Sequence, residues 1–183
     1  MGLIIILAMV AATLWAVYLY NQLVRQKNLM KEAESGIDVQ LKRRHDLIPN
    51  LIETVKGYQR HEKTTLEEVV KLRTQLQCPV PMKDRPGLES QLSRSLKTIF
   101  ALAESYPDLK ANQNFLDLQK NLVEIEDQIQ MARRYYNGTV RDYNVAVQQF
   151  PGNIVADKFG FKPAEFFEIE YATERKTPDV KFV

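Results

Sequence analysis

The chain has 183 residues, of which 45% are hydrophobic and 26% are charged, and its formal net charge is +2. This near-neutral balance, without a basic stripe interleaved with aromatic residues, argues against nucleic-acid binding. The single cysteine excludes an intramolecular disulfide framework.

An apolar run at the N-terminus is the first element of the chain. Residues 3–20 are almost entirely apolar, with Thr13 as the polar exception, and no charged side chain lies between Gly2 and Val24. A helix of this length spans about 27 Å, close to the roughly 30 Å hydrocarbon core of a bilayer. We therefore predict a membrane anchor over residues 1–24, with residues 3–24 in contact with membrane lipid.

Three other interpretations of this run are less favoured. A cleaved signal peptide would have a basic region before the run and a small-residue cleavage site after it, and neither pattern occurs. A lipoprotein would have a cysteine after the run, but Cys78 is far away. A buried core helix would be unusually long for so apolar a stretch.

The charges that flank the run predict its orientation. Basic residues follow it, whereas only the α-amino group precedes it; they are Arg25, Lys27, Lys31, Lys42, Arg43 and Arg44. Positive flanks stay on the cytoplasmic side. We expect the N-terminus outside the cell and the body in the cytoplasm.

The body begins with a long helical stretch, predicted over residues 21–77 because apolar residues recur every three or four positions. Pro49 lacks a backbone donor and clashes with the preceding turn, which predicts a kink or short break over residues 46–50. Three prolines predict a loop over residues 78–87.

Further helices are expected over residues 88–105, 115–150 and 153–159, with a turn at residues 106–108. In the longest of these, apolar residues follow one another at a mean spacing of about 3.5, as in the seam of a left-handed helical bundle. Aromatic residues between Phe161 and Tyr171 are expected either to seal the open end of the bundle or to dock a neighbour.

Together these elements predict an all-α protein. A single transmembrane helix would continue directly into an up-down antiparallel four-helix bundle with long helices, standing off the membrane. The expected organisation is an anchor at residues 1–24, a bundle at 25–171 and a flexible tail at 172–183.

No constellation in the sequence predicts catalysis. His45 and His61 are sixteen residues apart, which separates them by more than about 20 Å on a straight helix. Cys78 has no histidine near it in sequence, and no phosphate-binding loop or nucleophile motif occurs. We predict no catalytic, cofactor or metal site and a protein that is not an enzyme.

Polar residues with helical spacing are the unusual feature of the body. On the first stretch they are Arg44, Asp46, Asn50 and Glu53; on the long helix they are Glu126, Arg133, Asn137 and Asn144. If the two helices pack together, these stripes could meet as carboxylate–guanidinium and amide hydrogen bonds that set register. A solvated face and a ligand or partner site stay open as alternatives to this favoured network.

Several stretches of the chain closely resemble the bacterial LemA family. They are Tyr20–Val24, Ile37–Tyr58 with its Arg-His-Asp-Leu-Ile-Pro-Asn block, His61–Lys63, Tyr106–Asn112, Arg133–Asn137, Phe150–Ala156 and Phe159–Pro163. The resemblance implies a four-helix bundle on one N-terminal helix of the bacterial inner membrane, placed N-outside. It implies no catalytic residue and no cofactor, a loose link to envelope maintenance, and HtpX-like membrane proteases as neighbours.

We therefore expect a non-enzymatic, membrane-anchored interaction or assembly protein of the bacterial envelope that forms a homo-oligomer. The alternative is an accessory or regulatory subunit of an HtpX-like membrane protease.

Overall fold

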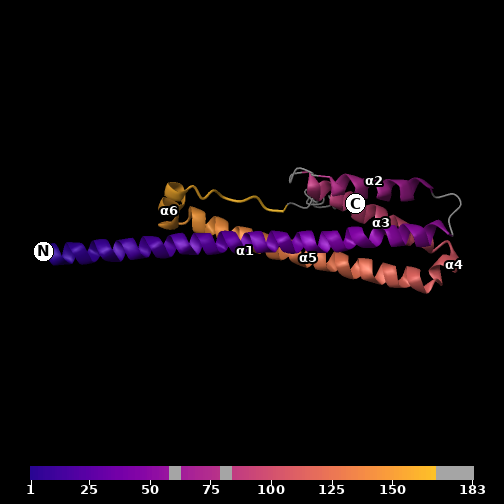
Figure 1. The fold of residues 1–183 in the computed structure, drawn as a ribbon, viewed down its shortest axis with the longest axis horizontal. Coiled ribbons are helices and arrows are strands. Elements are labelled where there is room, and N and C mark those ends of the chain that lie inside the picture. Colours follow the sequence, from indigo (N-terminus) through magenta and orange to yellow (C-terminus); the bar gives the residue numbers. More distant parts are fainter. Residues whose placement is uncertain (58–62, 79–83, 168–183) are drawn as a thin grey trace, which may run out of the picture. The chain divides into compact units, whose positions relative to one another are not determined.

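A computed structural model describes residues 1–57, 63–78 and 84–167 of the chain, and these residues form helices and no strand (Figure 1). The helices are α1 (Gly2–Lys56), α2 (Lys63–Gln77), α3 (Arg85–Ala103), α4 (Pro107–Lys110), α5 (Gln113–Gln148) and α6 (Gly152–Phe159). The predicted all-α class is confirmed. His61, Tyr58, Tyr171 and the predicted tail over residues 172–183 lie outside the described residues.

The chain forms two compact units that divide both long helices. Unit 1 combines residues 1–40 with residues 129–167, and unit 2 contains residues 41–128. Unit 1 therefore holds the N-terminal part of α1, most of α5 and all of α6. Unit 2 holds the C-terminal part of α1, the helices α2, α3 and α4, and the first turns of α5.

The predicted helix over residues 21–77 is two helices, and the position of the interruption differs from the prediction. Helix α1 continues past Pro49 to Lys56 without a break. Pro49 cannot donate to the carbonyl of His45, four residues earlier. Arg73 of α2 donates its Nε–H to that carbonyl oxygen over 3.1 Å instead. The freed acceptor is thus satisfied from a neighbouring helix, and the helix tolerates the proline.

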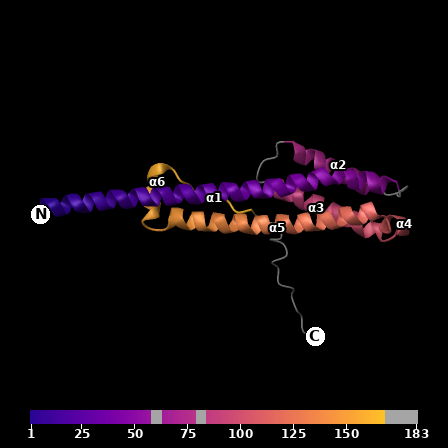
Figure 2. The same ribbon diagram turned by 60° about the horizontal axis from the view of Figure 1, so that its bottom comes forward.

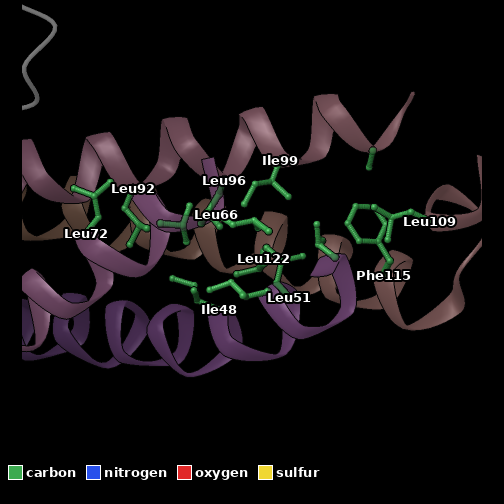
Figure 3. Close-up of a cluster of buried hydrophobic side chains, with 14 residues drawn as sticks. Ile48, Leu51, Leu66, Leu72, Leu92, Leu96, Ile99, Leu109, Phe115 and Leu122 are labelled. Atoms are coloured by element: carbon green, nitrogen blue, oxygen red, sulfur yellow. The ribbon is translucent and has the colours of Figure 1, made fainter. Parts of the chain in front are cut away.

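The core of unit 2 is a cluster of aliphatic side chains with one phenylalanine (Figure 3). Helix α1 contributes Ile48, Leu51 and Val55, each fully buried. Phe115 of α5 packs edge-on against Phe100 of α3, with ring centroids 6.2 Å apart. The remaining buried members are Ile52, Leu66, Val69, Leu72, Leu92, Leu96, Ile99, Ala103, Leu109 and Leu122. Burying each large aliphatic side chain contributes about 1.5–3 kcal/mol, so this cluster holds the helices of unit 2 together.

Unit 1 has its own, smaller core where α6 folds back beside α5 and α1 (Figure 2). Leu23, Tyr143, Val147, Val155 and Ala156 are buried in it. The chain turns tightly between the helices, since a Cβ added at Gly152 would collide with the backbone carbonyl oxygen of Ala146. Gly160 ends α6 in the left-handed region at φ 72°, a conformation that glycine adopts at little cost.

The remaining element boundaries differ from the predictions by a few residues. Helix α3 begins at Arg85 with Pro86 in its first turn, so the predicted loop over 78–87 ends earlier. The predicted turn at residues 106–108 leads into the single helical turn α4.

Candidate functional site

The N-terminal part of α1 carries a continuous apolar surface that the described protein does not cover. Every residue from Met1 to Tyr18 is exposed. Its most apolar window has a mean hydropathy of 2.4, and none of that window is buried. Within the described residues, α1 is the one helix long and apolar enough to cross a membrane. The structure thus contains a candidate membrane span where the sequence predicts one.

The last residues of the apolar run pack against protein rather than standing clear of it. Leu23 is 2% exposed and belongs to the core of unit 1, where Leu19 packs beside it. The ring of Tyr20 lies 4.8 Å from that of Phe159. The prediction of lipid contact through residue 24 is therefore wrong for Leu23, because α5 and α6 cover it.

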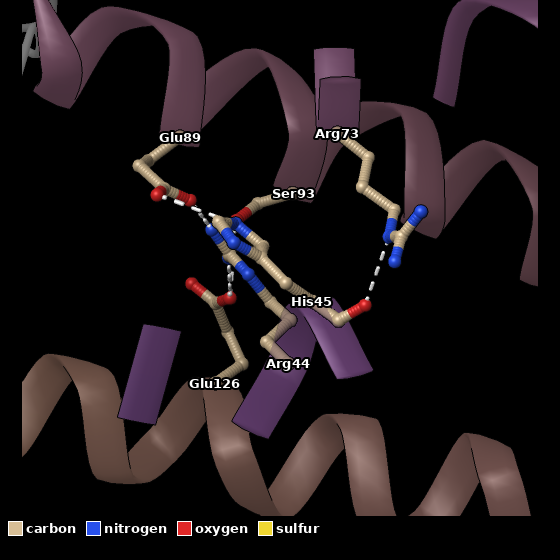
Figure 4. Close-up of polar contacts among 6 residues, drawn as sticks. All are labelled: Arg44, His45, Arg73, Glu89, Ser93 and Glu126. Carbon is tan, nitrogen blue, oxygen red and sulfur yellow. Dashed lines mark hydrogen bonds and ion pairs between the residues drawn. The ribbon is translucent and has the colours of Figure 1, made fainter. Parts of the chain in front are cut away.

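A buried ionic cluster lies inside unit 2 (Figure 4). Arg44 of α1 and Glu89 of α3 are each 1% exposed and form an ion pair. Arg44 Nη1 also donates to Glu126 Oε2 of α5 over 2.8 Å and to Ser93 Oγ over 2.7 Å. Ser93 in turn donates to Glu126 over 3.0 Å. One guanidinium thereby joins three helices.

His45 completes this cluster from the next position of α1. Its Nε2 lies 3.4 Å from Glu89 Oε1. Burial by itself raises the pKa of Glu89, but the neighbouring His45 and the charge of Arg44 outweigh it and hold that pKa below its ordinary value. Glu89 is therefore a carboxylate at neutral pH, and the cluster sets two carboxylates against one guanidinium.

The structure brings two of the predicted polar residues together, Arg44 and Glu126. Asp46, Asn50 and Glu53 are exposed instead. Asp46 pairs with Lys42 one turn away on the same helix, and both side chains are largely in solvent. The expectation that these three residues join a buried network is wrong, because their stripe of α1 faces away from the core of unit 2.

Asn137 and Asn144 bind backbone rather than a neighbouring helix. Asn144 accepts from the N–H of Ala164 over 2.8 Å and donates to its carbonyl over 2.9 Å. Asn137 makes the same pair of bonds with Phe167, over 2.8 and 3.1 Å. These two amides clamp the segment after α6 along α5, which corrects the expected amide contacts between α1 and α5.

Arg133 belongs to the same arrangement in unit 1. It is 4% exposed, and its guanidinium lies 4.7 Å from the ring centroid of Phe167. The predicted carboxylate–guanidinium contact across the helices is therefore made by Arg44, whereas Arg133 stacks on an aromatic ring.

The polar residues predicted from the sequence to form a network do not include three members of the cluster: His45, Glu89 and Ser93. A signal for Glu89 was present, because it precedes Leu92, Leu96, Ile99 and Ala103 at offsets of three or four. A carboxylate in such an apolar seam needs a buried cation, and Arg44 holds the equivalent seam position on α1.

Both terminal nitrogens of Arg44 bond to protein groups, whereas its buried Nε makes no hydrogen bond within the described part of the chain. No group of three or more potential metal ligands occurs among the residues that the structure describes. Desolvation of the two charges offsets much of the attraction in a buried ion pair.

Comparison with known proteins finds relatives over most of the chain. The LemA family model matches residues 33–182. Protein LemA of Metamycoplasma hominis is 29% identical over 161 residues, which cover 87% of this chain and 72% of that protein. Magnetosome protein MamQ 2 of Paramagnetospirillum magneticum is 32% identical over 82 residues, covering 45% of this chain. Magnetosome protein MamQ of Magnetospirillum gryphiswaldense is 30% identical over 81 residues, covering 44% of this chain. The match spans 30% of the length of each of these two magnetosome proteins.

Proposed function

Because the chain belongs to the LemA family, we propose that it is a membrane-anchored, non-enzymatic interaction and assembly protein of the bacterial envelope. The observation that carries the proposal is the exposed apolar surface of α1 from Leu3 to Tyr18. Single soluble proteins rarely expose an apolar surface of this extent. Lipid is the environment in which such a helix is stable, because its backbone groups are satisfied internally.

The proposed orientation places the N-terminus outside the inner membrane and both units in the cytoplasm. Arg25 and Lys27 follow the apolar run directly, and basic residues beside a membrane span favour the cytoplasmic side.

Cys78 offers a direct test of this orientation, because it is exposed and is the single cysteine of the chain. A membrane-impermeant maleimide should label it in lysed cells and not in intact spheroplasts. As a matched control, a Gly2→Cys variant in a Cys78→Ser background should be labelled in intact spheroplasts as well as in lysed cells. Labelling of Cys78 from outside would contradict the orientation.

Self-association is the form of interaction that we propose. Copies anchored in one bilayer have a raised effective concentration, so weak side-to-side contacts suffice. Helix α5 offers apolar side chains for such a contact, since Met131 and Tyr135 lie one turn apart and are 53% and 57% exposed.

Photo-crosslinking in native membranes tests this contact. A photoreactive amino acid at position 135 should give a band of two joined copies, and the same group at the exposed Val39 should give less. A Tyr135→Glu change should reduce crosslinking initiated from Met131. Failure of position 135 to join two copies would contradict self-association, and capture of a membrane protease there would favour the accessory-subunit alternative.

A further inference from the structure

Unit 1 exposes a second apolar surface, at the turn from α5 into α6. We call residues 149–161 the elbow. Three large apolar side chains of the elbow point into solvent: Phe150, Ile154 and Phe159 are 72%, 59% and 58% exposed. Such a density of exposed apolar side chains on so short a segment indicates a surface that is covered in the working protein.

The elbow lies level with the end of the apolar run of α1. The ring of Tyr20 is 4.8 Å from that of Phe159 and 5.7 Å from that of Phe161. Leu19 of the run and Phe150 of the elbow also line one pocket, of about 410 Å³. From Gly2 to Tyr20 the helix rises about 27 Å, which is nearly the thickness of a hydrocarbon core. A bilayer that holds the run thus ends at the height of the elbow.

The side chains around the elbow are those found at a membrane–water boundary. Tyrosine and tryptophan rings gather at that depth, and interfacial helices place phenylalanine and aliphatic side chains there. Lysines extend their charged ends toward the headgroups. Lys158 and Lys162 are exposed beside the apolar side chains, with Asp157 as the one acidic residue of the elbow. Lys27 of α1 lies over the ring of Phe161, 5.5 Å from its centroid.

We propose that the elbow is a second membrane-contact surface, which inserts Phe150, Ile154 and Phe159 at the boundary between the headgroups and the acyl chains of the bilayer that α1 spans. Lys158 and Lys162 would contact anionic lipid phosphates. The inference rests on the proposed membrane anchor and adds to it: two points of contact hold unit 1 against the bilayer, where one helix alone would let it swivel.

Depth-dependent quenching of tryptophan fluorescence tests the proposal. Trp15 is the single tryptophan of the chain and lies in the apolar run. The whole protein is reconstituted in phosphatidylglycerol–phosphatidylcholine vesicles with brominated acyl chains, which quench only tryptophans that reach the lipid. In a Trp15→Phe background, an Ile154→Trp variant reports on the elbow. A Val39→Trp variant is the control. Val39 is exposed to a similar degree as Ile154, but it lies about 28 Å beyond Tyr20 along α1.

We expect strong quenching of Trp15 in the unaltered chain, quenching at least half as strong in Ile154→Trp, and several-fold weaker quenching in Val39→Trp. Quenching of Trp15 with none in Ile154→Trp would overturn the elbow contact and leave the anchor intact. Absence of quenching at Trp15 would overturn both. An unquenched Ile154→Trp emission that shifts to the blue as protein concentration rises would show a second copy on the elbow instead of lipid.

Charge reversal provides an independent readout. The double change Lys158→Glu and Lys162→Glu should lower the quenching of the Ile154→Trp variant in phosphatidylglycerol vesicles at least twofold at low salt. In the chain that keeps Trp15, the same double change should leave the quenching of Trp15 unchanged. Equal quenching with and without the two lysines would refute their contact with anionic phosphates.

Discussion

Replacement of Arg44 by methionine tests whether the ionic cluster is buried as the structure shows. The guanidinium is 1% exposed and bonds to Glu89, Glu126 and Ser93. Methionine keeps much of the aliphatic volume but removes the charge. The change leaves the carboxylate of Glu89, also 1% exposed, without the guanidinium that compensates its desolvation.

The expected loss of stability is large for a single substitution. Removing one partner of a buried ion pair costs about 3–5 kcal/mol, because the other charge stays buried. For a chain of this size each kcal/mol lowers the melting temperature by roughly 2–4 °C, so we expect a fall of about 6–20 °C. The matched control is Lys42→Met, because the Lys42–Asp46 pair lies in solvent and is worth at most about 1 kcal/mol.

The assay is thermal and denaturant unfolding of the whole protein in detergent micelles, followed by helical circular dichroism. A melting temperature for Arg44→Met within the range of Lys42→Met would refute the burial argument. Replacing Arg44, Glu89 and Glu126 together by apolar residues should recover most of the loss, since no charge then remains buried.

The stability of the unaltered protein and of Arg44→Met should depend differently on pH. The pKa of Glu89 is lowered in the folded protein. Its contribution to the free energy of unfolding is therefore fully present above the unfolded pKa near 4.5 and is lost as the pH falls through the folded value. In Arg44→Met, protonation instead relieves an uncompensated carboxylate. The stability gap between the two proteins should therefore narrow as the pH is lowered below about 4.5. A gap that is constant or widens in acid would contradict this account.

Three further substitutions probe other parts of the molecule. Gly152→Ala should destabilise unit 1 by about 1–3 kcal/mol, measured by denaturant unfolding, because the new methyl group meets the carbonyl oxygen of Ala146. Asn144→Ala should speed hydrogen exchange at the amide of Ala164 at least tenfold, since its acceptor is lost; unchanged exchange would show that the clamp is not formed. Asp46→Leu should change the free energy of unfolding by no more than about 0.5 kcal/mol, because the Asp46 side chain is 60% exposed. A larger loss would show that Asp46 belongs to a buried network, as the sequence predicts.

The all-α class and the apolar span could be predicted from sequence because both depend on local pattern. Helical spacing along residues 115–150 arises from one buried face, and α5 (Gln113–Gln148) follows it within two residues at each end. The span needs only length and apolar character. Leu23 shows where this reasoning ends, since composition cannot tell burial in lipid from burial in protein.

The partners of the polar residues could not be predicted, because they depend on contacts between distant segments. Pro49 predicts a kink or a short break in the helix, but Arg73 on another helix satisfies the carbonyl that the proline leaves without a donor. Asn137 and Asn144 repeat with the same helical period as Glu126, yet they clamp the backbone after α6.

The sequence by itself therefore determined the class of fold and the apolar N-terminal segment, since hydrophobic period and length act within a single helix. Only the tertiary structure decided that Arg44 is enclosed by Glu89, Ser93 and Glu126 while Asp46 remains in solvent. The physical reason is that a polar side chain has the same helical spacing whether it faces water or a buried partner. Its environment is set by what packs against it.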